Sequence, residues 1–172
     1  ILFIEPSSRG PADDRALAQA IARSGKVVLA AGLGEVRESG WIQTLEKIQT
    51  PLPEIRAGAA AWGPVNILTD RDAFVRRGRL TIDFQDREYP GFDLQIYRLA
   101  KANGIPAAPL PSSPEFWINY AGPPDVFPRV AYSRVVSGEI PPEAFEGKIV
   151  LVGATTQILQ DVFPTPFAPF RT

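Results

Sequence analysis

The chain of 172 residues contains no cysteine, no histidine and no methionine. Their absence excludes thiol nucleophiles, imidazole acid/base chemistry, Ser/His triads and zinc sites built from Cys or His. Catalysis would have to rely on carboxylates, Lys, Tyr, Ser or Thr, or on a hard metal ion held by oxygens. We expect no cofactor and no metal ion. The lack of Cys is compatible with an oxidising compartment.

The sequence also lacks an excess of one charge and any long apolar run. Lys and Arg number 18 against 19 Asp and Glu, which offers no basic face for nucleic acid or an anionic membrane. No stretch approaches the roughly 20 apolar residues of a membrane span, and no signal peptide is present. The chain begins abruptly at Ile1 without Met and ends at Thr172. We therefore expect residues 1–172 to be a single domain that is truncated at both ends.

The residues that are present predict an α/β fold in which strands and helices alternate. Ile1–Ile4 and Val27–Ala31 are apolar runs typical of strands, and a helix capped by Asp13 and ended by Gly25 separates them. Strand, helix and strand form a βαβ unit with a right-handed crossover. The inward face of this helix is predicted to carry Leu17, Ala20 and Ile21, and the glycines of Gly32-Leu-Gly34 are predicted to lie in a loop.

The middle of the chain predicts a hairpin and a second helix. Residues 35–60 fit either a short helix or an exposed strand that prolines stop, whereas 62–68 and 75–84 read as two paired strands joined by a turn. Phe92–Ala102 is an amphipathic helix with Phe92, Ile96 and Leu99 inward. A proline-rich connector, a strand and a short helix are expected to follow, at residues 106–114, 116–120 and 132–137.

Ile149–Val152 is an unbroken apolar run, which favours a strand covered on both faces. With the other elements it predicts a three-layer α/β domain with a mixed, mostly parallel sheet and an antiparallel hairpin. Ligands of open α/β sheets bind beyond the carboxyl ends of strands. A small-molecule pocket is therefore predicted after Val152, where Gly153 lets backbone approach. Its expected ligand-binding residues are Asn66, Arg76, Asn119, Tyr120, Thr155 and Asp161, with Trp62 as a further wall.

Each of these residues also has a purely structural interpretation. Arg76 could clamp a carboxylate or phosphate, but an ion pair with Asp70 or Asp72 is the favoured alternative. Asn66 and Asn119 could satisfy backbone groups near bends, and the aromatic residues could be core. Asp70, Asp72 and Asp161 lack the full set of oxygens that a Ca²⁺ loop needs.

Several segments in order resemble the second type of CHASE domain, the cyclase- and histidine-kinase-associated sensory extracellular domain. The resemblance is strongest over residues 145–155 and 161–166 and weak over 35–49. The other segments that carry it are Ile1-Leu-Phe-Ile-Glu-Pro-Ser-Ser, Asp13-Asp-Arg-Ala-Leu, Gly63-Pro-Val-Asn, Asp70-Arg-Asp, Val75-Arg-Arg and Ile118-Asn-Tyr-Ala-Gly-Pro. The chain lacks the first strand and helix of the family pattern and the end of the domain. Arg71 and Ala73 replace a Pro and a Gly that the family favours.

The resemblance implies the extracytoplasmic sensory domain of a bacterial transmembrane receptor, followed by a cyclase, histidine kinase or Ser/Thr kinase. It implies a domain that is not itself an enzyme and that binds an unknown small molecule or a periplasmic partner. The flanking segments would attach it to the membrane, and a homodimer is possible. Two other functions stay open at this point: a soluble carboxylate-dependent hydrolase, for which no pair of acids has a defined separation, and a dimerisation scaffold that senses nothing.

Overall fold

The computed structural model describes residues 1–33, 36–39, 42–45, 48–67, 69–123, 126–154 and 163–167. The chain divides into two compact units. Unit 1 comprises Ile1–Ile67 and Arg79–Glu115, and unit 2 comprises Leu68–Gly78 and Phe116–Thr172.

Unit 1 begins with helix α1 (Pro11–Ser24), which confirms the first predicted helix. The helix starts earlier than expected: Gly10 is the N-cap, and Pro11 tolerates the first turn because it has no N–H to leave unbonded. Asp13 therefore lies inside the first turn and is not the cap. Gly25 ends the helix as predicted, with φ 61° and its N–H bonded to the Ile21 carbonyl at 3.1 Å.

The neighbouring acid, Asp14, is the side chain that fixes the loop before α1. Its buried carboxylate accepts hydrogen bonds from the Ser7 N–H at 3.0 and 3.2 Å. The predicted strand Ile1–Ile4 is wrong, because this segment has no strand structure. The Phe3 carbonyl does accept one backbone bond, from Leu52 at 2.8 Å.

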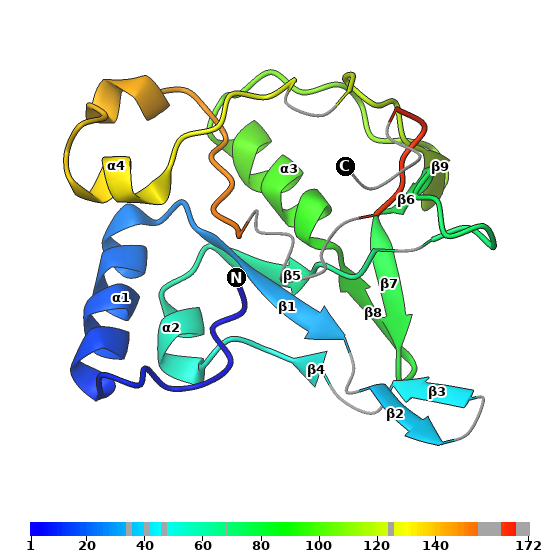
Figure 1. Cartoon of the computed structure of the whole chain (residues 1–172), viewed down its shortest axis with the longest axis horizontal. Helices are drawn as coiled ribbons and strands as arrows, with labels where there is room; N and C mark the ends of the chain where they lie inside the picture. Colours follow the sequence, from blue (N-terminus) through cyan, green and yellow to red (C-terminus); the bar gives the residue numbers. More distant parts are fainter. Residues whose placement is uncertain are drawn as a thin grey trace. The chain divides into compact units, whose positions relative to one another are not determined.

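The central sheet of unit 1 is mixed, with strand order β4-β1-β5 (Figure 1). β1 (Val28–Leu33) runs parallel to β5 (Ala61–Pro64) and antiparallel to β4 (Ile48–Gln49). Gly32 lies inside β1 and not in a loop. β2 (Val36–Ser39) and β3 (Ile42–Leu45) form an antiparallel pair, so the strand alternative is confirmed for these residues, whereas residues 53–57 of the same stretch form a helix.

Helices pack on the sheet through apolar side chains and one glycine. Ile55 of α2 (Pro53–Ala57) forms a core cluster with Ile21 and Leu29, and Trp62 packs against it. At Gly63 an added Cβ would lie 2.7 Å from the backbone N of Phe92, the first residue of α3 (Phe92–Ala102). Consecutive strand residues point to opposite faces. The start of α3 therefore lies on the face of β5 opposite to the Trp62 side chain.

The bounds predicted for α3 are confirmed, but its inner face is rotated relative to the prediction. Leu94 and Ala100 are its buried residues, whereas Phe92, Ile96 and Leu99 are only partly buried. Similarly, the predicted inward residue Ala20 of α1 is exposed, and Ile21 is buried.

The antiparallel hairpin lies elsewhere than predicted. β7 (Thr81–Phe84) pairs with β8 (Arg87–Pro90) across Gln85 and Asp86, whose φ angles are 49° and 57°. Positive φ at both central residues is what a two-residue hairpin turn requires. The predicted pairing of 62–68 with 75–84 is wrong, because β5 pairs with β1. The stretch 75–84 splits into β6 (Arg77–Arg79), which pairs with β9 (Glu115–Trp117), and β7.

Unit 2 contains the turn predicted over residues 69–74, α4 (Tyr132–Val136) and a 3-10 helix, η1 (Pro142–Phe145). The predicted buried strand Ile149–Val152 is wrong. These residues have no strand structure, and their exposed fractions are 51%, 51%, 72% and 59%. An apolar run marks a segment able to form a strand, but it supplies neither the pairing strand nor the covering layers.

The α/β class with mixed and antiparallel sheets is confirmed. Of the pairs with a defined register among the described strands, β1–β5 is parallel, and β1–β4, β2–β3 and β7–β8 are antiparallel. The three-layer arrangement stays a prediction.

Candidate functional site

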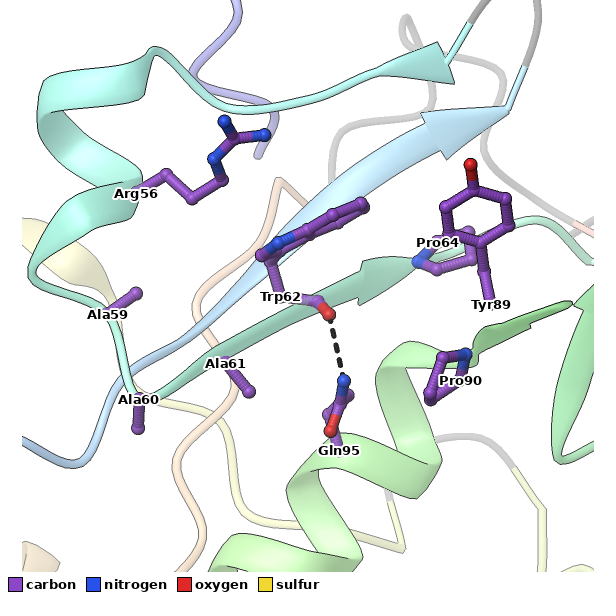
Figure 2. Close-up of a pocket in the computed structure, with 9 residues that line it drawn as sticks. All are labelled: Arg56, Ala59, Ala60, Ala61, Trp62, Pro64, Tyr89, Pro90 and Gln95. Atoms are coloured by element: carbon purple, nitrogen blue, oxygen red, sulfur yellow. Dashed lines mark hydrogen bonds between the residues drawn. The ribbon is translucent and has the colours of Figure 1, made fainter. Parts of the chain in front are cut away.

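Unit 1 contains a pocket of about 450 Å³ between α2, β5, β8 and α3, which we call the Trp62 pocket (Figure 2). This volume lies within the range of small-molecule sites. The residues that line it are Arg56, Ala59, Ala60, Ala61, Trp62, Pro64, Tyr89, Pro90 and Gln95. No lining residue is an Asp or a Glu.

Two aromatic rings line this pocket, and a guanidinium group lies over each of them. The Trp62 and Tyr89 ring centroids are 6.2 Å apart, with the planes tilted by 46°. The Arg56 guanidinium lies 5.7 Å from the Trp62 ring, and that of Arg87 lies 5.9 Å from the Tyr89 ring. Figure 2 shows Arg56 and Tyr89 on either side of Trp62. Arg87 and Tyr89 are two apart on β8 and so share a face.

The polar groups of the pocket are only partly used by the protein. The Gln95 side-chain amide donates a hydrogen bond to the Trp62 carbonyl at 3.1 Å, which fixes the orientation of Gln95. Its carbonyl oxygen and the Tyr89 hydroxyl bond to no other residue in the described part of the chain. The surface of the pocket is about equally polar and apolar, and two of its polar groups are therefore available to a ligand.

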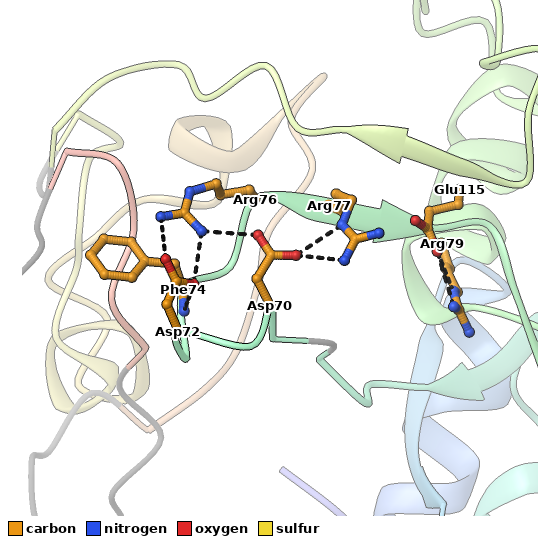
Figure 3. A network of polar contacts seen from close by, with 7 residues as sticks. All are labelled: Asp70, Asp72, Phe74, Arg76, Arg77, Arg79 and Glu115. Carbon is orange, nitrogen blue, oxygen red and sulfur yellow. Dashed lines mark hydrogen bonds and ion pairs between the residues drawn. The ribbon is translucent and has the colours of Figure 1, made fainter.

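A second cluster of polar side chains lies in unit 2, and its charges are paired within the protein (Figure 3). Arg76 donates to Asp72 at 2.8 and 2.9 Å and to Asp70 at 3.0 Å. Arg77 donates to Asp70 at 2.6 and 2.9 Å. The Arg76 guanidinium also lies 4.4 Å from the Phe74 ring. Arg76 thus forms the ion pairs that the sequence favoured over a ligand clamp.

The pairing shifts the proton affinities of these groups. Hydrogen bonds from Arg77 and Arg76 lower the pKa of Asp70, and a hydrogen bond from Arg76 lowers the pKa of Asp72. The same bonds raise the pKa of Arg76. Two carboxylates of the cluster thus face two guanidiniums of the same chain.

The structure does not test the predicted convergent site. Thr155 and Asp161 lie outside the described residues. Asn66 is exposed and belongs to unit 1, whereas Arg76, Asn119 and Tyr120 belong to unit 2. Tyr120 donates its hydroxyl to the Val75 carbonyl at 2.7 Å, and burial raises its pKa. Asn119 is exposed. A ligand role for these six residues stays a prediction.

Sequence reasoning missed all three polar side chains of the Trp62 pocket, those of Arg56, Tyr89 and Gln95. Trp62 lines this pocket, whereas the sequence predicted it as a wall of a different pocket, after Val152, and that prediction is not tested. The alternation of Arg87 and Tyr89 after Gln85 and Asp86 was a local signal for β8. No local signal indicates that β8 lies near α2, because that proximity arises from tertiary packing.

In the described residues, no group of three Asp or Glu side chains could hold a metal ion. Among the same residues, no helix is both long and apolar enough to cross a membrane.

The comparison with family models decides the family. The model of the CHASE2 domain matches residues 1–172, the whole chain. The chain belongs to the CHASE2 domain family. CHASE2 domains are extracellular sensory domains of receptors and are not catalytic, as the resemblance implied. No curated protein and no solved structure matches the chain.

Proposed function

We propose that this CHASE2 domain is the ligand-sensing part of a bacterial transmembrane receptor and lies outside the cytoplasmic membrane. Its output would be an adenylate cyclase, a histidine kinase or a Ser/Thr kinase, and the chain itself would carry out no catalysis. The observation that carries the proposal is the Trp62 pocket, whose aromatic walls and available polar groups are typical of small-molecule sites. A ligand signals only if it binds one receptor conformation more tightly than another.

A thermal-shift screen of the 172-residue chain with a metabolite library tests ligand binding. A compound that binds the native state raises the unfolding temperature, because binding adds to the free energy of unfolding. We expect Trp62→Leu to abolish the shift. Trp117→Leu is the matched control: Trp117 is 73% exposed in unit 2, and this variant should keep the shift.

The same variants in the full-length receptor test signalling. Trp62→Leu should remove the ligand-dependent change in cyclase or kinase activity, and Trp117→Leu should leave it intact. If no library compound shifts the unfolding temperature while the chain forms stable dimers, a dimerisation scaffold would replace the sensor. If a ligand raises the unfolding temperature equally in Trp62→Leu and in Trp117→Leu, the Trp62 pocket is not its binding site.

A further inference from the structure

Two groups of arginines in the described part of the chain differ in their partners. Arg76, Arg77, Arg79 and Arg134 each hold an Asp or Glu at 2.6 to 3.1 Å. Arg56 and Arg87 lie over aromatic rings, as Arg76 also does, but among the described residues neither Arg56 nor Arg87 makes an ion pair with a carboxylate. Arg79 and Glu115 illustrate the first group (Figure 3). The second group has a positive charge without a neutralising partner among the same described residues.

A guanidinium over a ring can still bind an anion. A guanidinium carries five N–H donors, and in the described part of the chain those of Arg56 donate to no other residue. Arg56 is half-buried, and its charge is therefore screened less by water than that of an exposed side chain.

We infer that the Trp62 pocket takes a planar organic anion, a carboxylate carried by an aromatic or conjugated ring. This inference rests on the proposed function and specifies its ligand class. Arg56 would bind the carboxylate through charge-assisted hydrogen bonds, and the Trp62 and Tyr89 rings would contact the ligand ring. Arg87 would add positive potential beside Tyr89.

The lining disfavours the other ligand classes. An organic cation would find no carboxylate among Arg56, Trp62, Tyr89, Gln95 and the Ala and Pro residues of the pocket. The positive charge of Arg56 would also repel it. A purely apolar ligand would leave Arg56, the Tyr89 hydroxyl and the Gln95 carbonyl oxygen without partners, which costs binding free energy.

Benzoate and benzamide are suitable probes, because they have the same ring and nearly the same shape but differ in charge. We expect isothermal titration of the 172-residue chain to show benzoate binding at least about tenfold more tightly than benzamide. Raising the salt concentration should weaken benzoate binding, because salt screens the attraction between its carboxylate and Arg56. Benzamide carries no charge, so its binding should not change.

Variants of Arg56 assign the effect to the pocket. Arg56→Gln should weaken benzoate binding by about tenfold or more without changing that of benzamide. Arg56→Lys keeps the charge but loses the planar fork, so its benzoate affinity should fall between those of the wild type and Arg56→Gln. Arg15→Gln makes the same chemical change on the exposed surface of α1 and should have no effect.

Any of three results would overturn the inference: equal affinities for the two probes, unchanged benzoate affinity in Arg56→Gln, or no saturable benzoate binding.

Other results would overturn the proposed function independently of this inference. If the library yields a neutral ligand whose thermal shift depends on Trp62, the proposed sensory function is retained and the proposed preference for anions is rejected. If Trp62→Leu changes neither the thermal shift nor the receptor output, the pocket itself is excluded as the sensing site.

Discussion

At the scale of single residues, Ala73 holds an unusual backbone conformation. Its φ is 66°, in the left-handed region where a Cβ is strained. Two backbone hydrogen bonds keep it there: the Ala73 N–H donates to the Asp70 carbonyl at 2.9 Å, and the Asp70 N–H donates to the Phe74 carbonyl at 2.8 Å. The resemblance implied a glycine at this position, so the turn keeps a glycine-like geometry with a residue that disfavours it.

Ala73→Gly should therefore stabilise the chain. Glycine adopts positive φ without strain, and after its extra conformational entropy is subtracted the gain should be about 1 kcal/mol in the free energy of unfolding. Denaturant unfolding measures it. Ala16→Gly, on the exposed surface of α1, is the control and should instead cost about 1 kcal/mol. A loss of stability in Ala73→Gly would show that the turn in solution has a different conformation.

Glycines also show what sequence could not predict at this scale. Gly153 was expected to let backbone approach a ligand, and a Cβ added there would meet no protein atom within 4 Å, so that expectation stays a prediction. A close approach within the protein occurs at Gly63, against the first residue of α3. Gly63 and Gly153 both follow apolar residues in the sequence. Only the packing of a helix start on β5 distinguishes their roles.

At the scale of elements, ion pairs add to the backbone hydrogen bonds of the turn from Asp70 to Arg77. Asp70 and Asp72 have lowered pKa values in the folded chain, from an ordinary value of 3.8. A carboxylate whose folded pKa is depressed stabilises the fold above its unfolded pKa, and this contribution is lost as the pH falls through the folded pKa. The turn should thus be unaffected from neutral pH down to about pH 4 and should weaken below it.

NMR titration of the carboxylate carbons, combined with two variants, tests this arrangement. Arg77→Gln should raise the pKa of Asp70 and leave that of Asp72, because Arg77 bonds only to Asp70 of the two. Arg76→Gln should raise both, and the Asp72 pKa should rise further because Asp70 keeps Arg77. Arg134→Gln, whose partner is Glu139, serves as control and should change neither. Equal responses of both carboxylates to Arg77→Gln would contradict the assigned contacts.

Elements differ in how far their local sequence determines them. The bounds of α3 and the end of α1 were predicted because caps and helical periodicity are local signals. Strand pairing was not predicted, because a strand needs a partner that is often distant in sequence. The hairpin turn at Gln85 and Asp86 lacks the Asn-Gly or Asp-Gly pair that signals such turns. Local sequence signals could not have identified the residues of the Trp62 pocket, because a pocket joins residues from several elements.

At the scale of the whole molecule, apolar burial is distributed unevenly. In the described part of the chain, Val75 is the buried apolar residue of unit 2, whereas the others belong to unit 1: Ile21, Leu29, Ala31, Ile55, Phe84, Leu94 and Ala100. Unit 2 also exposes large apolar side chains, among them Phe127 and Val136 at 70% and 69%. Regions with few buried contacts open at lower free-energy cost than regions with a packed core.

Hydrogen exchange of the 172-residue chain should reflect this distribution. Amides of β1, β5 and α3 should exchange slowly, because opening them disrupts the unit 1 core, whereas amides of residues 126–154 should exchange much faster. Slow exchange at Val150 and Val152 would contradict the exposed and unpaired state of this segment. It would instead support the buried strand that the apolar character of the segment predicted. The full-length receptor provides the decisive comparison. If these amides are protected there but not in the 172-residue chain, the strand-forming run pairs with a segment outside residues 1–172, and burial of Ile149–Val152 depends on the rest of the receptor.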